Sequence, residues 1–162
     1  MVEIIMFASL ILPWFTLFFT NPEERKKYMP VTIFTSLLMT IIFQIAYTYE
    51  WWILHKQIVP WGYMIDVSFV YGIFAIGTFW IFRFTSHNFL MYIIVNLIMD
   101  AIMAFIALPL LGVLGIATYK SINPWQYLLV MVGLSFIIYI YHKWQQKIFV
   151  KDPNRKDRVK DN

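Results

Sequence analysis

The 162-residue sequence contains no cysteine and few charged residues, and both shortages narrow the class of protein. Without cysteine the chain forms no disulfide, performs no thiol chemistry and accepts no lipobox lipid. Charged residues make up 14% of the chain, whereas hydrophobic residues make up 60%. A soluble domain of this size cannot cover so much apolar surface, so the composition favours a protein embedded in a lipid bilayer.

The sequence also lacks the patterns that mark common active sites. No Ser-His-Asp set shares one depth, no glycine-rich loop is placed to hold a phosphate, and no H-E-x-x-H pattern occurs. Glu50 and His55 are potential metal ligands without a third at helical spacing, so we expect no metal and no cofactor. We therefore expect no enzyme. One enzymatic alternative stays open, an intramembrane enzyme acting on lipid, for which the sequence offers two acids and no nucleophile.

Five apolar stretches of membrane-spanning length take up most of the chain, at residues 4–20, 30–48, 62–82, 89–108 and 126–141. A helix needs about 20 residues to cross a hydrocarbon core roughly 30 Å thick, and the stretches lack the alternation of barrel strands. We predict an all-α fold, an integral membrane bundle of five transmembrane helices. The transmembrane helical domain covers 1–146, and a charged, disordered cytoplasmic tail covers 147–162.

Two prolines are expected to mark the limits of these spans. Pro30 is expected near the first turn of the second span, where proline is tolerated, and Pro109 is expected to end the fourth span. Residues 109–119 then have three possible structures: a re-entrant segment, a surface segment, or a continuation of the fourth span.

The basic residues gather on one side of this arrangement. Eleven of the 13 Lys and Arg residues fall on one face, and only Lys56 and Lys120 fall on the other. The positive-inside rule then predicts a multi-pass cell-membrane protein with its N-terminus outside and its C-terminus in the cytoplasm. This topology explains the net charge of +4, so we expect no nucleic-acid partner. The expected partner is the bilayer, with anionic lipid near Lys143 and Lys147 at the cytoplasmic face.

Several hydrophobic motifs resemble a known family. They are Tyr28–Phe34, Trp61–Tyr63, Gly77–Phe82 and Leu90–Phe105. Together they are similar to a family of uncharacterised small multi-pass membrane proteins of spore-forming Gram-positive bacteria, over roughly residues 10–145. The resemblance implies one membrane domain in the plasma membrane and supplies no catalytic residue.

Asp100 is the most informative polar residue in the predicted spans. It lies about 16 Å from the cytoplasmic end of its helix, near the midplane, where an unaccommodated carboxyl costs about 2.5–3.5 kcal/mol. We expect it to lie inside the bundle, to hold its proton at neutral pH, and to donate a hydrogen bond to Asn96 or to a polar group of the second span. Asn96, Ala104 and Ala107 share its helix face. Asp100 is then either a proton or ion site, or an interhelical hydrogen bond that locks the bundle.

The second and third spans carry the other polar candidates. Asp66 is predicted about 6 Å below the outer boundary, as a solvated carboxylate or the wall of a vestibule. Gln44 is predicted at a similar height and could meet Asp66 across the two helices. Gln44 and Thr40 belong to a polar stripe at i+4 spacing, which either lines a hydrophilic path or returns its hydroxyl hydrogen bonds to its own helix. The stripe consists of Thr32, Ser36, Thr40, Gln44 and Thr48.

Two functions remain in competition. The first is a non-enzymatic component of the envelope or sporulation membrane that packs against partners, either copies of itself or other membrane proteins. Small residues at Ser68, Gly72 and Ala75 suit such packing and predict that the third span is central in the bundle. The alternative is a small oligomeric transporter or channel subunit with a polar path lined by Asp100, Asp66, Gln44 and Asn96. A dry contact at Asp100 would favour packing, and a cavity would favour transport.

Overall fold

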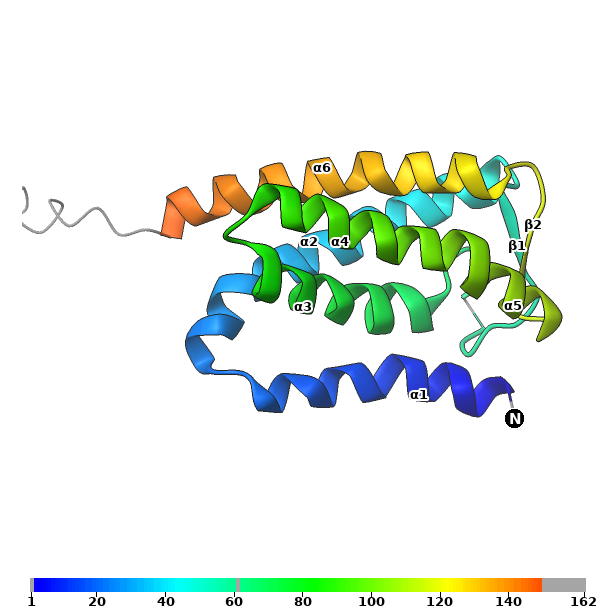
Figure 1. Ribbon diagram of the computed structural model, residues 1–162. Coiled ribbons are helices and arrows are strands. Elements are labelled where there is room, and N and C mark those ends of the chain that lie inside the picture. The colour runs from blue at the N-terminus through cyan, green and yellow to red at the C-terminus, as the bar shows by residue number, and fades with distance from the viewer. Residues whose placement is uncertain (1, 61, 150–162) are drawn as a thin grey trace, which may run out of the picture.

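The computed structural model describes residues 2–60 and 62–149, which form a helical bundle (Figure 1). Four helices are long and apolar enough to cross a membrane, namely Val2–Phe19, Pro22–Thr48, Phe89–Val113 and Pro124–Ile148. A fifth apolar helix, Phe69–Thr85, is shorter. The predicted class, a multi-pass helical membrane protein, is therefore confirmed in its broad form.

The elements follow one another along the chain in a simple up-and-down order. Helix α1 (Val2–Phe15) ends in a 3₁₀ turn, η1 (Thr16–Phe19), and precedes α2 (Pro22–Thr48) and strand β1 (Trp52–Leu54). The π-helical segment η2 (Phe69–Phe74) runs into α3 (Ala75–Thr85). Helix α4 (Phe89–Ile102) continues through a second π-helical segment, η3 (Met103–Ala107), into α5 (Leu108–Val113). Strand β2 (Ala117–Tyr119) and helix α6 (Pro124–Phe149) complete the described chain.

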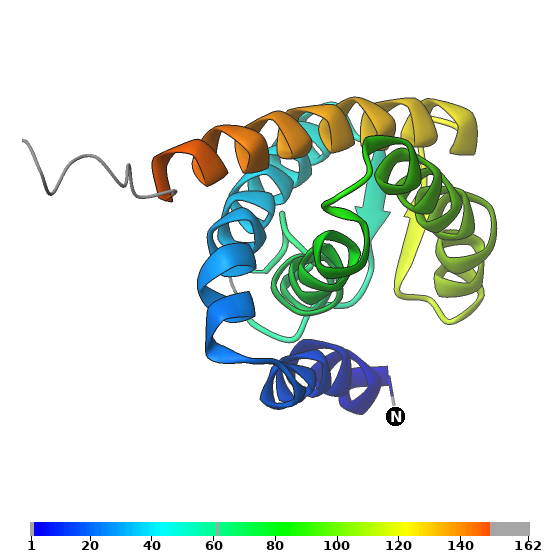
Figure 2. The same cartoon turned by 60° about the vertical axis from the view of Figure 1, so that its left-hand side comes forward.

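Helix α3 lies in the middle of the bundle, as the small residues of its span predicted. Figure 2 shows it enclosed by α1, α2, α6 and the α4–α5 helix. Its buried side chains include Ile76, Phe79 and Phe82, each no more than 2% exposed. The central apolar helix, Phe69–Thr85, is thus also the shortest of the five apolar helices in the described chain.

Helix α2 begins eight residues earlier than its apolar stretch predicted. The Asn21 N–H donates to the Glu24 carboxylate at 3.2 Å, and Pro22 occupies the first turn, where its missing N–H is not needed. The basic residues expected in a loop at 21–28 therefore lie on the first turns of a helix, and Pro30 is inside it. The prediction that Pro30 lies near the first turn is wrong, because the start signal lies upstream of the apolar run.

The prediction that Pro109 ends the fourth span is also wrong. Helix α5 carries the span on to Val113, with Pro109 in its first turn directly after η3. The wider turns of a π-helix already disturb the regular hydrogen-bond ladder there. The backbone hydrogen bond that Pro109 cannot donate is therefore a small loss. Gly115, with a φ of +67°, then turns the chain back towards β2. Three structures were possible for residues 109–119. Residues 109–113 continue the fourth span, and residues 117–119 form strand β2.

A short two-stranded sheet, which the sequence did not predict, covers one end of the bundle (Figure 1). Strands β1 and β2 pair antiparallel, with Trp52 opposite Tyr119 and Leu54 opposite Ala117. The Lys120 ammonium lies 2.7 Å from the Glu50 carboxylate beside this sheet. The connections that follow α2 and α5 are therefore joined into one structure.

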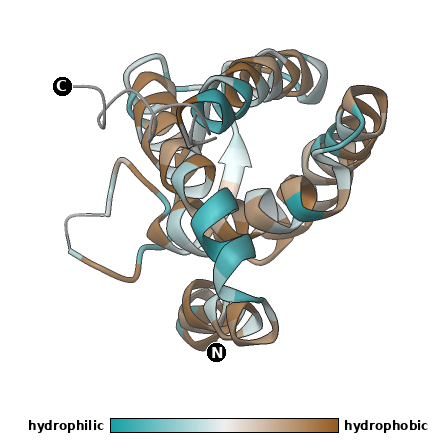
Figure 3. Ribbon diagram, turned by 90° about the vertical axis from the view of Figure 1, so that its left-hand side faces the viewer, coloured by the Kyte–Doolittle hydropathy of each residue, from teal (hydrophilic) through white to brown (hydrophobic). Residues whose placement is uncertain are grey.

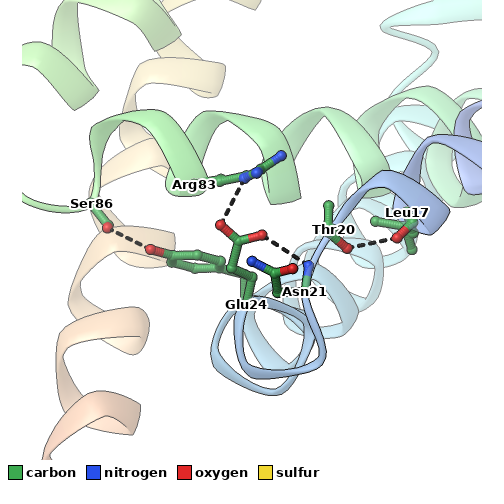
Figure 4. Close-up of polar contacts among 7 residues, drawn as sticks. Leu17, Thr20, Asn21, Glu24, Arg83 and Ser86 are labelled. Carbon is green, nitrogen blue, oxygen red and sulfur yellow. Dashed lines mark hydrogen bonds and ion pairs between the residues drawn. The ribbon is translucent and has the colours of Figure 1, made fainter.

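The opposite end carries most of the basic side chains within the described ranges. Figure 4 shows the Arg83 guanidinium contacting the Glu24 carboxylate, at 3.0 Å from Nε to Oε1. The Gln145 amide donates to the Lys27 carbonyl at 3.0 Å and so brings the end of α6 to the start of α2. Helix α6 runs through Phe149, beyond the predicted tail boundary at residue 147. The remainder of the predicted tail, 150–162, lies outside the described residues.

Candidate functional site

A cavity of about 110 Å³ lies inside the bundle between α2, α3, α4 and α6. Most of its lining is apolar, but polar side chains reach it from all four helices, so the volume suits several water molecules or a small hydrated cation. The polar lining residues are Thr35, Thr78, Asn96, Asp100 and Ser135. Four methionines, Met39, Met99, Met103 and Met131, supply much of the remainder.

Asp100 is the acidic residue of this cavity and is only 7% exposed. The prediction that its side chain lies inside the bundle is confirmed. Its Oδ2 atom is buried and accepts no hydrogen bond from any residue that the structure describes. A buried carboxyl oxygen without a protein partner is unfavourable, so this atom calls for a proton, water or a cation. The cavity provides the space for it.

Asn96 lines the same cavity but is not the partner of Asp100. Its amide donates to the Tyr92 carbonyl of its own helix at 2.8 Å. Asp100 was expected to donate a hydrogen bond to Asn96 or to a polar group of the second span. Its Oδ2 forms a hydrogen bond with neither among the described residues, so this predicted bond is not found. Tyr92 in turn donates its hydroxyl to the Ser135 carbonyl at 2.9 Å and links α4 to α6 next to the cavity.

Asp66 occupies a different environment from the one that the sequence predicted. It is 4% exposed, and its Oδ1 accepts the N–H groups of Ser68 at 3.0 Å and Phe69 at 3.2 Å. The prediction of a solvated carboxylate is wrong, because the helix starts after Asp66 instead of at residue 62 and the two strands fold over it. Asp66 caps the helix and lines a second cavity, of about 30 Å³, together with Trp52 and Leu54 of β1.

Phe74 and Met103 separate the two cavities, since each of them lines both. Phe74 belongs to the π-helical segment η2, and Met103 begins η3. Each π-helical segment starts three residues after an aspartate, Asp66 in one case and Asp100 in the other. Single π-helical turns inside helices are often found at functional sites, and here both flank the same pair of cavities.

Each π-helical segment also has a carbonyl that accepts a hydrogen bond from a distant aromatic side chain. The Trp14 indole of α1 donates to the Tyr71 carbonyl at 2.8 Å, and the Tyr119 hydroxyl of β2 donates to the Ala104 carbonyl at 3.0 Å. Inside a bilayer such carbonyls need protein partners, because no bulk water reaches them. Burial raises the pKa of Tyr119 to about 12, so this hydroxyl remains a donor across the physiological range.

The polar stripe of α2 does not line the cavity at Asp100 or the cavity at Asp66. The hydroxyl of Thr40 contacts the Ser36 carbonyl at 2.8 Å and the Tyr71 hydroxyl at 3.0 Å. The hydroxyls of Thr32, Ser36 and Thr48 also return hydrogen bonds to carbonyls of their own helix, which is the second of the two predicted interpretations.

Gln44 is exposed, and the described chain holds no hydrogen bond between Gln44 and Asp66. Residues at i+4 spacing advance about 400° around a helix, which is about 40° beyond a full turn per step. Three steps therefore rotate the stripe by about 120°, from the buried Thr32 to the exposed Gln44. The prediction placed Gln44 and Asp66 at similar heights, but height does not determine which way a helix face points. The rotation turns Gln44 outward, whereas Asp66 is buried.

His142 is a buried polar residue that was not among the residues predicted for the site. It is fully buried between the rings of Tyr28 and Phe82, with ring centroids 5.7 and 4.4 Å away. Its Nδ1 has no partner among the described residues, and its Nε2 lies 3.0 Å from the Gln146 amide nitrogen. The signal was present in the sequence, since His142 continues a helical stripe of α6 that includes Ser135 and Ile138, both buried.

The fold and these cavities indicate a multi-pass helical membrane protein whose apolar interior holds a few buried polar side chains. Comparisons with family models, with curated proteins and with solved structures found no match for this chain. The resemblance to small membrane proteins of spore-forming bacteria therefore stays a prediction that depends on the quoted motifs.

Proposed function

We propose that this protein is a small transporter or channel subunit that carries protons or small cations through its bundle, with Asp100 as the binding group. The observation that supports this most is the buried Oδ2 of Asp100, which has no partner among the described residues and lines a cavity of about 110 Å³. Intramembrane carboxyls in bundle interiors commonly mark ion and proton pathways.

The two cavities suggest the course of the path. A proton or cation would pass the small cavity beneath β1 and β2, move between Phe74 and Met103, and reach Asp100 and Asn96. Methionine has a flexible side chain, so Met103 can move aside at little cost. Asp66 lines the small cavity and fixes the start of the central helix there by accepting the Ser68 and Phe69 N–H groups. Gln44 and Thr40 have no part in this path.

The orientation belongs to the same proposal. With the basic residues at the end formed by the start of α2, the end of α3 and the end of α6, the positive-inside rule places that end in the cytoplasm and the strands outside. The N-terminus is then outside and the C-terminus inside. Five helices are few for a transporter, so we expect the working unit to be a homo-oligomer.

The competing function is a structural component of the envelope or sporulation membrane that packs against partners. The small residues that suggested it are used within the chain, because Ser68, Gly72 and Ala75 are all buried. A Cβ on Gly72 would overlap the Ser9 carbonyl oxygen of α1 and lie 2.8 Å from the Leu10 Cα. This close contact packs α1 directly on η2. The small-residue face at Gly72 is therefore covered by the chain's own helix and is not open to a partner.

The test is ion flux into vesicles that contain the purified full-length chain. Proton entry is followed with a trapped pH-sensitive dye, and sodium and potassium are supplied in separate experiments. The wild type should conduct, and Asp100→Asn should return flux to the level of protein-free vesicles because the amide has the same shape but binds no proton. Gln44→Ala, an exposed position outside the cavities, is the matched control and should keep the flux. Equal flux in the wild type and Asp100→Asn would refute the proposal, as would a silent wild type.

A further inference from the structure

An open groove of about 520 Å³ runs along the side of the bundle between α1 and the first turns of α2. Its walls are apolar side chains of α1 and η1, among them Ile11, Trp14, Phe15 and Phe18, together with Met29 of α2. At one place the lining changes character, where Arg25 enters it. Figure 3 shows this change as the hydrophilic start of α2 lying against the hydrophobic α1.

Among the described residues that line the groove, Arg25 is the one cation, and its acidic neighbours contact other basic side chains. Glu23 contacts Lys26 at 3.2 Å, and Glu24 contacts Arg83 at 3.0 Å. Within the part of the chain that the structure describes, no carboxylate lies within ion-pair distance of Arg25. The guanidinium is partly buried at the end of an apolar groove, which is the position of a headgroup partner for a lipid.

We propose that this groove holds one anionic phospholipid, with an acyl chain along α1 and its phosphate at Arg25. The charge fits, because Arg25 has no carboxylate partner among the described residues and guanidinium binds phosphate in a bidentate geometry. The position fits as well, because Arg25 lies at the basic end of the bundle, together with Arg83, where membrane-surface phosphates would be found. This site is separate from the cavity at Asp100 and does not depend on the proposed transport.

The length of the groove favours a lipid chain over a partner helix. Its lining on α1 and η1 runs from Leu10 to Phe18, which is about 12 Å at 1.5 Å per residue. A spanning helix would need contact over most of a hydrocarbon core roughly 30 Å thick. An acyl chain that enters from the headgroup level needs only the near half of that core.

Lipid retention by the full-length chain tests the proposal. The protein is reconstituted in vesicles of equal phosphatidylglycerol and phosphatidylcholine, extracted in mild detergent, and weighed by native mass spectrometry with its bound lipids. We expect one retained phosphatidylglycerol, at about fivefold preference over phosphatidylcholine, which is the ratio expected for one basic side chain at an anionic surface. Arg25→Gln should remove the preference, and Arg25→Lys should keep part of it.

Lys26→Gln is the matched control, because Lys26 is exposed, pairs with Glu23 and does not line the groove. It should retain phosphatidylglycerol like the wild type. Thermal unfolding of each variant in detergent separates lost binding from lost folding, and a folded Arg25→Gln with wild-type retention would overturn the proposal. Equal retention of phosphatidylglycerol and phosphatidylcholine would overturn the proposal too. So would displacement of the retained lipid by inorganic phosphate alone. A protein dimer that contacts through Ile11 and carries no lipid would also overturn it.

Discussion

Asp66 and Asp100 are buried to nearly the same extent, at 4% and 7% exposure, but their surroundings differ. Asp66 accepts two backbone N–H groups at the start of a helix, whereas Asp100 has an oxygen with no partner among the described residues and a cavity in front of it. Burial alone therefore does not mark a functional carboxyl. The unmet hydrogen bond beside open space distinguishes the candidate site from the structural cap.

The largest effect that separates the two aspartates should appear in transport. Asp66→Asn should conduct like the wild type, since asparagine is as good a helix cap as aspartate. Asp100→Asn should fold normally and fail to conduct. The comparison would break down if Asp66→Asn also abolished flux while remaining folded, because Asp66 would then bind the transported ion itself.

A smaller effect should separate two faces of the central helix. Gly72→Ala should destabilise the protein by about 1–3 kcal/mol, because the added methyl group collides with the backbone of α1. Gly77 lines the cavity at Asp100 and has nothing within 4 Å of an added Cβ. Gly77→Ala should therefore be neutral, or stabilising by up to about 1 kcal/mol through helix propensity.

Denaturant unfolding of both variants in the same detergent measures this difference. Equal losses of unfolding free energy in the two variants would contradict the predicted contrast between the two faces. They would mean that neighbouring side chains move to fill the space at Gly77.

A comparable or slightly smaller effect concerns the Asp66 cap. Asp66→Ala should lower the free energy of unfolding by about 0.5–2 kcal/mol, because the Ser68 and Phe69 N–H groups lose their acceptor. Asp66→Asn should restore most of that loss. If alanine proved as stable as aspartate, the cap assignment would be wrong.

The smallest effect is expected in the pH dependence of stability. Tyr119 has a pKa of about 12 in the folded protein against 10.0 as its ordinary value, because burial disfavours the phenolate. Above pH 10 the unfolded chain loses this proton more readily than the folded chain, so stability falls as the pH rises towards 12. Tyr119→Phe should remove this part of the pH dependence and also the hydrogen bond to Ala104. Unfolding measured at pH 9 and pH 11 in both proteins tests it, and an unchanged slope in Tyr119→Phe would contradict the assignment.

The sequence predicted those features that depend on composition and helical period. The apolar runs gave the helical spans, and the insertion cost of a carboxyl near the midplane placed Asp100 inside the bundle. The features that depend on local hydrogen bonds were missed. The cap at Asn21 moved the start of α2 upstream of its apolar run, and η3 allowed the helix to pass Pro109.

Long-range arrangement was the other source of error. The pairing of β1 with β2 joins residues more than 60 positions apart, and no local pattern predicts it. That pairing is what buries Asp66, so the error in the solvation of Asp66 follows from it. The suggested contact between Gln44 and Asp66 fails for a simpler reason. Side chains at equal heights meet only if their helix faces point toward each other, and Gln44 lies on an exposed face of α2.

The central claim is that Asp100 faces a hydrated cavity and is not a dry packing group. Infrared spectroscopy of the wild type and of Asp100→Asn tests it most directly, by isolating the carboxylic acid band that the substitution removes and following it after transfer to D₂O. The account predicts a protonated carboxyl at neutral pH whose band shifts as soon as the solvent is exchanged. A band that exchanges only as slowly as the protected backbone amides of the spans would contradict the account, because it would identify Asp100 as a dry contact.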